Sequence, residues 1–314
     1  MAIINPLFSY PRLVMLPSLA IAAALIIYWA LITRYIFNER ARQRKGRHPM
    51  PTDFKLLRSP GEYLQEQILR VSDEVENHIY LTFLMPPALA VVSLILLPLI
   101  PARLQWWLAA LALIPFFVSV RLRSRDLLSL LEERRCYRLG LLGERAVAEQ
   151  LEAFRAEGFH VFQDVPATGS TRKFNLDHVL VGPAGVFVIE TKARQKANPS
   201  PQDDDQIVTV DHSVLHWASL GDDHESIPQA SNNAKWLRDF IKEKLNIVVT
   251  PIPVVVIPGW FIKPPPWEDQ GGTAVSNLKQ LEGVIKGPRV LEDRAVDLIR
   301  RRLLDECRTV PFAV

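Results

Sequence analysis

Three long apolar stretches occupy the first third of the chain. Residues 14–33, 81–100 and 104–120 each contain no charged side chain. An apolar stretch of about 20 residues is long enough to cross the hydrocarbon core of a bilayer as a helix. The pattern therefore predicts three transmembrane helices. Because only three residues separate the last two stretches, we expect them to form a tight helical hairpin.

The segment between the first and second stretches has a helical pattern of its own. Apolar residues recur there with the spacing of one helix face, opposite a charged face: Leu64, Ile68, Val71, Val75 and Ile79. The motif Ser59-Pro60-Gly61 marks the expected start of this helix. The pattern predicts a cytoplasmic helix within the loop 34–80 that leads into the second span.

Basic residues gather at two of the four membrane boundaries. Six lysines and arginines follow the first stretch within residues 34–47 and six arginines follow the third within residues 121–138, whereas Arg12 and Arg103 stand alone at the other ends. Cytoplasmic loops carry the excess of basic residues. We therefore expect a multi-pass protein of the inner (cytoplasmic) membrane, with the bilayer as a partner, the N-terminus outside and everything after residue 120 in the cytoplasm. A cleaved signal peptide is the alternative for residues 14–33, but the stretch is long and no small-residue cleavage site follows it.

From about residue 126 the apolar runs become shorter and alternate with polar residues. The order predicted is a helix over 139–154, a strand over 159–165, two strands within 174–192, and an antiparallel pair at 206–210 and 214–220. A helix over 228–245, a strand over 252–262 and helices over 277–285 and 291–306 follow. This order predicts one α/β or α+β domain. The expected division is therefore a membrane region over 1–125 and a cytoplasmic domain over 126–314.

Composition narrows the chemistry only slightly. Cys136 and Cys307 are the only cysteines of the sequence, which argues against a disulfide framework and against a thiolate zinc site. His212 and His216 are the only close histidine pair and give a weak metal signal. The net charge of +3 does not by itself indicate a nucleic-acid partner.

Charged residues interrupt the apolar strands of the stretch "FNLDHVLVGPAGVFVIETK". If residues 182–185 form a four-residue turn around Pro183, Val181 pairs with Val186, and Asp177 then faces Glu190. Two carboxylates so placed repel each other, and a divalent cation between them would remove the conflict. Their hard oxygen atoms suit Mg²⁺ or Mn²⁺. A three-residue loop with a bulge at Gly185, or a surface salt bridge between Glu190 and Lys192, remains the alternative.

An acid followed on the paired strand by acid–x–lysine resembles the PD-(D/E)xK nucleases. The chain is similar in particular to the nuclease-related domain (NERD) family over about residues 139–305, in "GERAVAEQL", "NLDHVLVGPAGVFVIETK" and "QASNNAKWL". Leu176 stands where the superfamily name has a proline. The resemblance implies a restriction-endonuclease-like α/β domain, with a mixed sheet flanked by helices.

The same resemblance implies a role for each matching residue. Asp177 and Glu190 would hold Mg²⁺ or Mn²⁺, and Glu144 would complete the metal shell or orient a water. Lys192 would position or deprotonate the attacking water, and Gln229 would orient the lysine or the water. Flanking basic residues could meet phosphates (Arg172, Lys173, Arg194 and Lys196), whereas nearby acids would repel them (Asp203, Asp204, Asp205, Asp222, Asp223 and Glu225).

Two functions from different classes follow. The first is a membrane-anchored, divalent-metal-dependent nuclease that hydrolyses phosphodiester bonds of DNA or RNA at the cytoplasmic face. The second is a catalytically inactive module of the same fold that binds nucleic acid or protein at the membrane. The retained acids and lysine favour the first, and the acidic loops favour the second.

Overall fold

The computed structural model describes residues 55–96, 102–167, 174–196, 206–218, 220–263 and 272–311, together with Ile27, Leu31, Arg34 and Tyr35. The chain divides into two compact units. The first comprises Met1–Pro49, Arg70–Glu133 and Ala313–Val314, and the second comprises Met50–Leu69 and Arg134–Phe312. The second unit thus includes a piece of the loop that the sequence analysis assigned to the membrane region.

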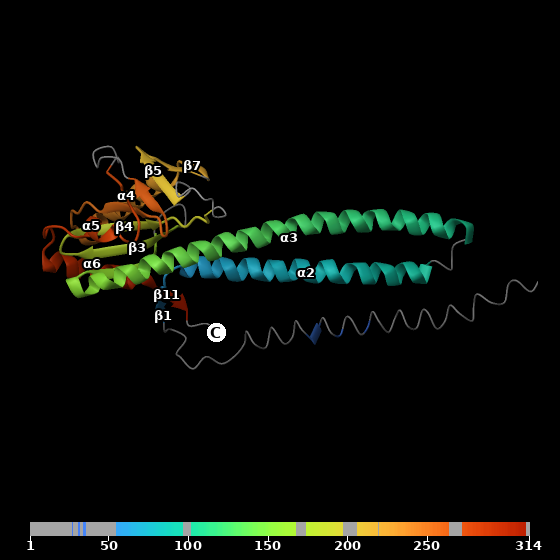
Figure 1. Cartoon of the computed structure of the whole chain (residues 1–314). Helices are drawn as coiled ribbons and strands as arrows, with labels where there is room; N and C mark the ends of the chain where they lie inside the picture. Colours follow the sequence, from blue (N-terminus) through green and yellow to red (C-terminus); the bar gives the residue numbers. More distant parts are fainter. Residues whose placement is uncertain are drawn as a thin grey trace, which may run out of the picture. The chain divides into compact units, whose positions relative to one another are not determined.

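Two long helices, α2 (Glu62–Leu96) and α3 (Ala102–Glu152), are labelled in Figure 1. The helix predicted after Ser59-Pro60-Gly61 is confirmed, because α2 begins at Glu62 and buries Val71 and Val75. The predicted second and third spans fall on α2 and α3. The third span and the opening helix of the domain are one continuous helix rather than two, since nothing between residues 120 and 139 interrupts α3.

The membrane anchor stays a prediction. Among the described residues, no helix is long and apolar enough to cross a membrane. The expected span over 14–33 lies outside the described residues apart from Ile27 and Leu31, and most side chains of the other two spans lie outside them as well.

The second unit is built on a mixed five-stranded sheet in the order β10-β8-β4-β3-β2. Strands β2 (His160–Pro166), β3 (Asn175–Gly182) and β4 (Gly185–Thr191) are antiparallel neighbours, whereas β8 (Ile252–Val256) and β10 (Ala274–Ser276) run parallel to β4. A mixed sheet flanked by helices fits the predicted α/β nuclease-like fold.

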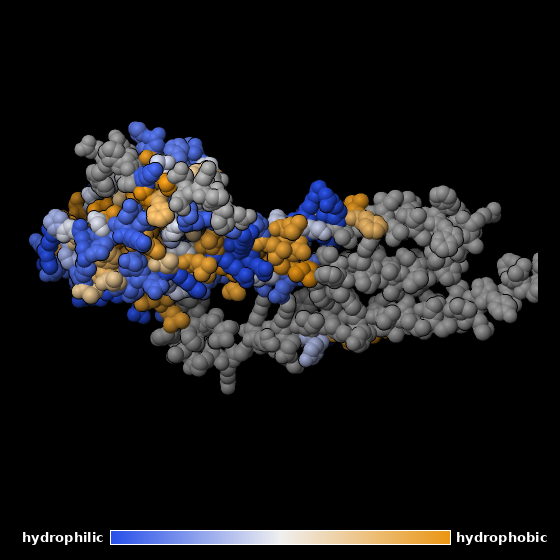
Figure 2. Space-filling view, in the orientation of Figure 1, coloured by the Kyte–Doolittle hydropathy of each residue, from blue (hydrophilic) through white to orange (hydrophobic). Residues whose placement is uncertain are grey.

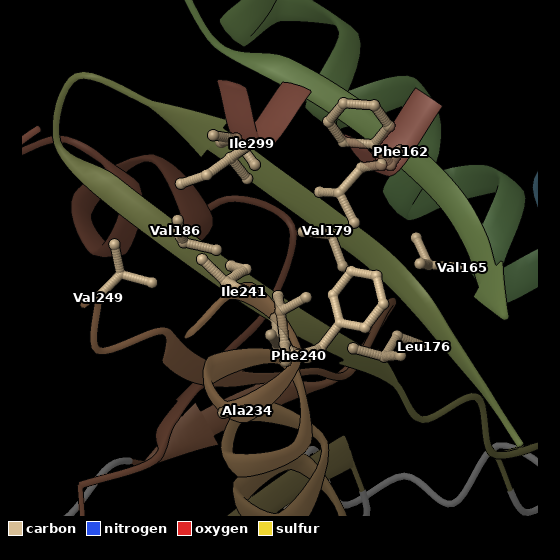
Figure 3. Close-up of a cluster of buried hydrophobic side chains, with 14 of the residues drawn as sticks. Phe162, Val165, Leu176, Val179, Val186, Ala234, Phe240, Ile241, Val249 and Ile299 are labelled. Atoms are coloured by element: carbon tan, nitrogen blue, oxygen red, sulfur yellow. The ribbon is translucent and has the colours of Figure 1, made fainter. Parts of the chain in front are cut away.

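Helices cover both faces of this sheet. One face packs against α4 (Ser226–Leu245) and α6 (Asp293–Cys307), and Figure 3 shows part of this cluster around Val179, Phe240 and Ile299. The other face packs against the end of α3, the 3₁₀ helix η3 (Ala153–Glu157) and α5 (Leu281–Ile285). Because successive strand residues point to opposite faces, β3 sends Val179 to the first cluster and Leu180 to the second. Each fully buried aliphatic side chain contributes about 1.5–3 kcal/mol.

Two smaller sheets complete the unit. β5 (Ile207–Asp211) and β6 (Val214–Trp217) form the predicted antiparallel pair, within the order β7-β6-β5-β9 that includes β7 (Gly221–Asp223) and β9 (Phe261–Lys263). The single strand expected over 252–262 is wrong, since β8 and β9 belong to different sheets and Gly259 turns the chain between them with φ +79°. β1 (Lys55–Leu57) pairs with β11 (Arg308–Pro311).

The described part of α3 in the first unit has a mixed surface. Phe117, Val118, Leu122 and Leu128 are exposed large apolar residues there, and Arg121 and Arg125 are exposed between them. Figure 2 shows apolar and strongly hydrophilic patches lying next to one another on one face of the molecule. Phe117 and Val118 belong to the end of the third predicted span, and the other residues follow it.

Candidate active site

The hairpin of β3 and β4 has the register that the sequence predicted. Val181 pairs with Val186 and His178 with Ile189, and Pro183 and Ala184 form the turn. The alternative with a bulge at Gly185 is thereby excluded. Extending the register by one pair places Asp177 across from Glu190.

Asp177 lies near the start of β3, beside the C-terminal end of β4. Its Oδ2 accepts a hydrogen bond from the backbone N–H of Thr191 at 2.7 Å. The pKa of Asp177 is raised to about 7. Burial is the main cause and the nearby Asp164 carboxylate adds to it, whereas the hydrogen bond from Thr191 and the charge of Lys192 act to lower the pKa. A carboxyl group with such a pKa changes its charge near neutral pH.

Two amides of α4 hold the Glu190 side chain. Gln229 donates to Glu190 Oε1 at 2.7 Å, and Asn233, one helical turn further along, donates to Oε2 at 3.0 Å. Glu190 is only 7% exposed, and burial followed by the charges of Asp177 and Glu144 holds its pKa well above the ordinary value. Gln229 therefore contacts the predicted ligand, whereas the sequence analysis placed it beside the lysine or the water.

Glu144 reaches the same cluster from α3. It is 7% exposed, and its Oε2 has no hydrogen-bond partner among the described residues. Burial, reinforced by Asp177 and Asp164, raises the pKa of Glu144 to about 9, and a backbone hydrogen bond from Gly61 opposes this effect. The three acids that the sequence proposed as metal ligands thus act on one another electrostatically.

A fourth acid, Asp164 on β2, was missed in the sequence. The pairs Gln163–His178 and Val165–Leu176 flank it, so Asp164 faces Asp177 from the side opposite Glu190. The pattern that identified Asp177, an acid inside an apolar strand, is also present in the sequence at Asp164. Three acids therefore lie in a row across β2, β3 and β4.

Lys192 is held by Asp223, another residue whose part the sequence analysis missed. Lys192 Nζ lies 3.2 Å from Asp223 Oδ2, and the predicted alternative pair with Glu190 does not form. Burial opposes the charge of Asp223, but hydrogen bonds from the backbone N–H groups of Ser226 and Glu225, together with Lys192, hold its pKa well below the ordinary value. Asp223 is buried, so it is not part of an exposed acidic surface. Residues 203–205 of the predicted acidic loop lie outside the described residues.

A buried histidine, His178, follows Asp177 on β3. The His178 Nδ1 bonds the Gln163 side-chain oxygen, and Nε2 lies 3.2 Å from Thr191 Oγ1. Burial lowers the pKa of His178 to about 3, so the ring is neutral and Nε2 accepts the hydroxyl hydrogen of Thr191. His178 thereby fixes the residue whose backbone N–H binds Asp177.

The oxygen atoms of these acids are of the kind that binds a hard cation, but the side chains are not spaced as in a metal site. Carboxylate oxygens are the ligands that Mg²⁺ and Mn²⁺ prefer, and the unpaired Oε2 of Glu144 is a free donor atom at the cluster. Over the described parts of the chain, however, no group of three or more His, Cys, Asp or Glu residues has the spacing of a metal site. The surface histidines His212 and His216 instead bond Asp211 and Asp222.

Comparison with known proteins gave a family match for part of the chain. Neither the curated proteins nor the solved structures gave a match. Residues 139–258 match the family model described as the nuclease-related domain. The matched stretch includes Glu144, Asp177, Glu190, Lys192 and Gln229. The chain therefore carries a nuclease-related (NERD) domain at residues 139–258.

Proposed function

We propose that this domain is a divalent-metal-dependent nuclease that hydrolyses phosphodiester bonds of DNA or RNA. The observation that carries the proposal is a cluster of three carboxyl groups, the buried Glu144 and Glu190 and the partly exposed Asp177, whose pKa values are all raised. Burying several acids side by side costs stability unless a cation compensates their charge. Perturbed acids gathered at one place are typical of a functional site.

In this proposal Asp177, Glu190 and Glu144 hold Mg²⁺ or Mn²⁺. A bound cation supplies positive charge that polarises the phosphodiester and makes a bound water more acidic. Ligation requires the side chains to move, because Glu190 now accepts hydrogen bonds from Gln229 and Asn233. Gln229 then acts as the residue that orients Glu190.

Lys192 is the proposed electrostatic partner of the scissile phosphate. Its charge already acts on both Asp177 and Glu190, where it lowers their pKa values. Its side chain is 25% exposed, so the ammonium is accessible to a substrate. Asp223 fixes its position from the N-terminal end of α4.

We also propose that the N-terminal region anchors the protein in the inner membrane, with the domain on the cytoplasmic side. Three apolar stretches and the distribution of basic residues support this topology. The exposed apolar and arginine residues of α3 after residue 116 suit the surface of an anionic leaflet.

One observation favours the alternative of a non-hydrolytic binding module. In the structure Lys192 forms an ion pair with Asp223, and both Glu190 side-chain oxygens accept hydrogen bonds. Such pairing satisfies Lys192 and Glu190 without a metal ion or a phosphate, as expected of an inactive fold.

Cleavage assays separate the two functions. The full-length protein is incubated with supercoiled, linear and single-stranded DNA and with RNA, in Mg²⁺ or Mn²⁺ and in a chelator. We expect metal-dependent cleavage of at least one substrate, and its loss in Glu190→Gln. If the wild-type protein cuts none of the four, the binding module takes the place of the nuclease.

A further inference from the structure

A segment before the matched residues takes part in the site. β1 (Lys55–Leu57) is tied to the second unit by its pairing with β11, and the backbone N–H of Arg58 donates to the carbonyl of Cys307 at 3.0 Å. The chain then turns through Ser59 to Gly61 into α2. This segment lies about 80 residues before the start of the family match at residue 139.

Arg58 forms an enclosed ion pair with Asp164. Its Nε donates to Asp164 Oδ2 at 2.7 Å, and a second guanidinium nitrogen contacts the same oxygen. The two side chains are only 11% and 5% exposed. Among the ion pairs of the described residues, this is the one that reaches the row of acids across the sheet, since Lys192 pairs with Asp223.

The first turn of α2 is bound to the same acids through its backbone. The N–H of Tyr63 donates to Asp164 Oδ2 at 3.0 Å, and Gly61 lies beside Glu144, since a Cβ at Gly61 would be 3.5 Å from Glu144 Oε2. Gly61 has φ +69°, and a Cβ there would lie 2.4 Å from Leu141 Cδ1. Only glycine therefore allows this close approach without strain.

We propose that Arg58 is a positioning residue of the site and that the segment Arg58–Tyr63 completes it. Arg58 supplies the positive charge that compensates the enclosed Asp164 carboxylate. Asp164 in turn accepts the N–H of Tyr63 and so holds the start of α2, which places Gly61 beside Glu144. The importance of Arg58 for cleavage rests on the proposed nuclease function, but its action through Asp164 does not.

A double-mutant cycle on the full-length protein tests the pair. Arg58→Met leaves Asp164 without its cation, so the melting temperature at neutral pH should fall by several degrees. Arg58→Met combined with Asp164→Asn should regain most of that loss, because a neutral amide needs no cation. Arg58→Lys should be intermediate, since lysine keeps the charge but not the two-nitrogen contact. Arg289→Met, which breaks an exposed pair with Asp293, is the control.

Two further measurements read the site itself. Hydrogen exchange of the Tyr63 amide, which donates to Asp164, should speed up in Arg58→Met and stay unchanged in Arg289→Met. The affinity for Mn²⁺ alone, followed by its electron paramagnetic resonance signal, should fall by about 10-fold in Arg58→Met, as for other outer partners of metal ligands.

The outcomes separate this inference from the proposed function. If the loss of stability in the double variant equals the sum of the losses in Arg58→Met and Asp164→Asn, or if the Tyr63 amide keeps its protection in Arg58→Met, the inference is wrong. If the wild-type protein binds no Mn²⁺, the metal-dependent nuclease is contradicted, while the melting and exchange results still decide whether Arg58 acts through Asp164.

Discussion

Replacing Glu144 with glutamine should stabilise the metal-free protein in a strongly pH-dependent way. The carboxyl group has a pKa of about 9 in the folded protein against 4.5 ordinarily. At pH 7 the group is ionised in the unfolded chain and protonated in the folded one, so folding must take up a proton. The difference between pH 7 and 4.5, at about 1.4 kcal/mol per pH unit, gives about 3 kcal/mol of lost stability.

The sign follows from the raised pKa. Stability that depends on Glu144 is fully present below pH 4.5 and is lost as the pH rises toward 9. Glu144→Gln cannot ionise, so its advantage over the wild type should be near zero at pH 4.5 and about 3 kcal/mol at pH 7. In a unit of this size that corresponds to about 6–12 °C in melting temperature.

The assay is thermal unfolding of the full-length protein in a chelator, from pH 4.5 to 9. Glu149→Gln is the matched control, because Glu149 lies on the same helix and is exposed. A constant difference between Glu144→Gln and wild type across this range would refute the electrostatic account of the cluster.

Three further outcomes are expected. Mn²⁺ at 100 times its dissociation constant should raise the stability of the wild type by about 2.7 kcal/mol in a melting assay, and Asp177→Asn should abolish this increase; an unchanged increase would mean that the cation binds elsewhere. Asp223→Asn keeps an acceptor for the start of α4 but removes the partner of Lys192, so urea unfolding should show a loss of about 1–3 kcal/mol, whereas the same change at the more exposed Asp222 should cost less. Cys136, which is exposed, should resist an impermeant thiol reagent in intact cells and react after permeabilisation; labelling of intact cells would reverse the proposed orientation.

The parts of the site that lie close together in sequence could be predicted. The β3–β4 register followed from a tight turn and strict alternation, both of which are local properties. The helix over 228–245 followed from the buried stripe of Ala230, Ala234 and Leu237, and Gln229 lies beside that stripe.

The parts of the site that depend on distant segments of the chain could not be predicted from the sequence. Arg58 and Asp164 are 106 residues apart, and no local pattern indicates that α2 begins against β2. Asp223 resembled a surface acid because it stands beside the acids Asp222 and Glu225 in the sequence, whereas in the structure it is buried and pairs with Lys192. The division between β8 and β9 was hidden because an apolar run of that length also suits one buried strand.

Lys192→Ala tests most directly whether the acid cluster belongs to an enzyme. The change removes a positive charge near the proposed phosphate but leaves all three carboxyl groups. Mn²⁺ affinity should persist, while single-turnover cleavage should fall by roughly 10²- to 10³-fold, the effect of losing one electrostatic donor. The double variant Lys192→Ala with Asp223→Asn, which leaves no unpaired acid, should show the same loss of rate. Lys235 is an exposed lysine on α4, and the control variant Lys235→Ala should cleave like wild type. Cleavage by Lys192→Ala at the wild-type rate would contradict the account.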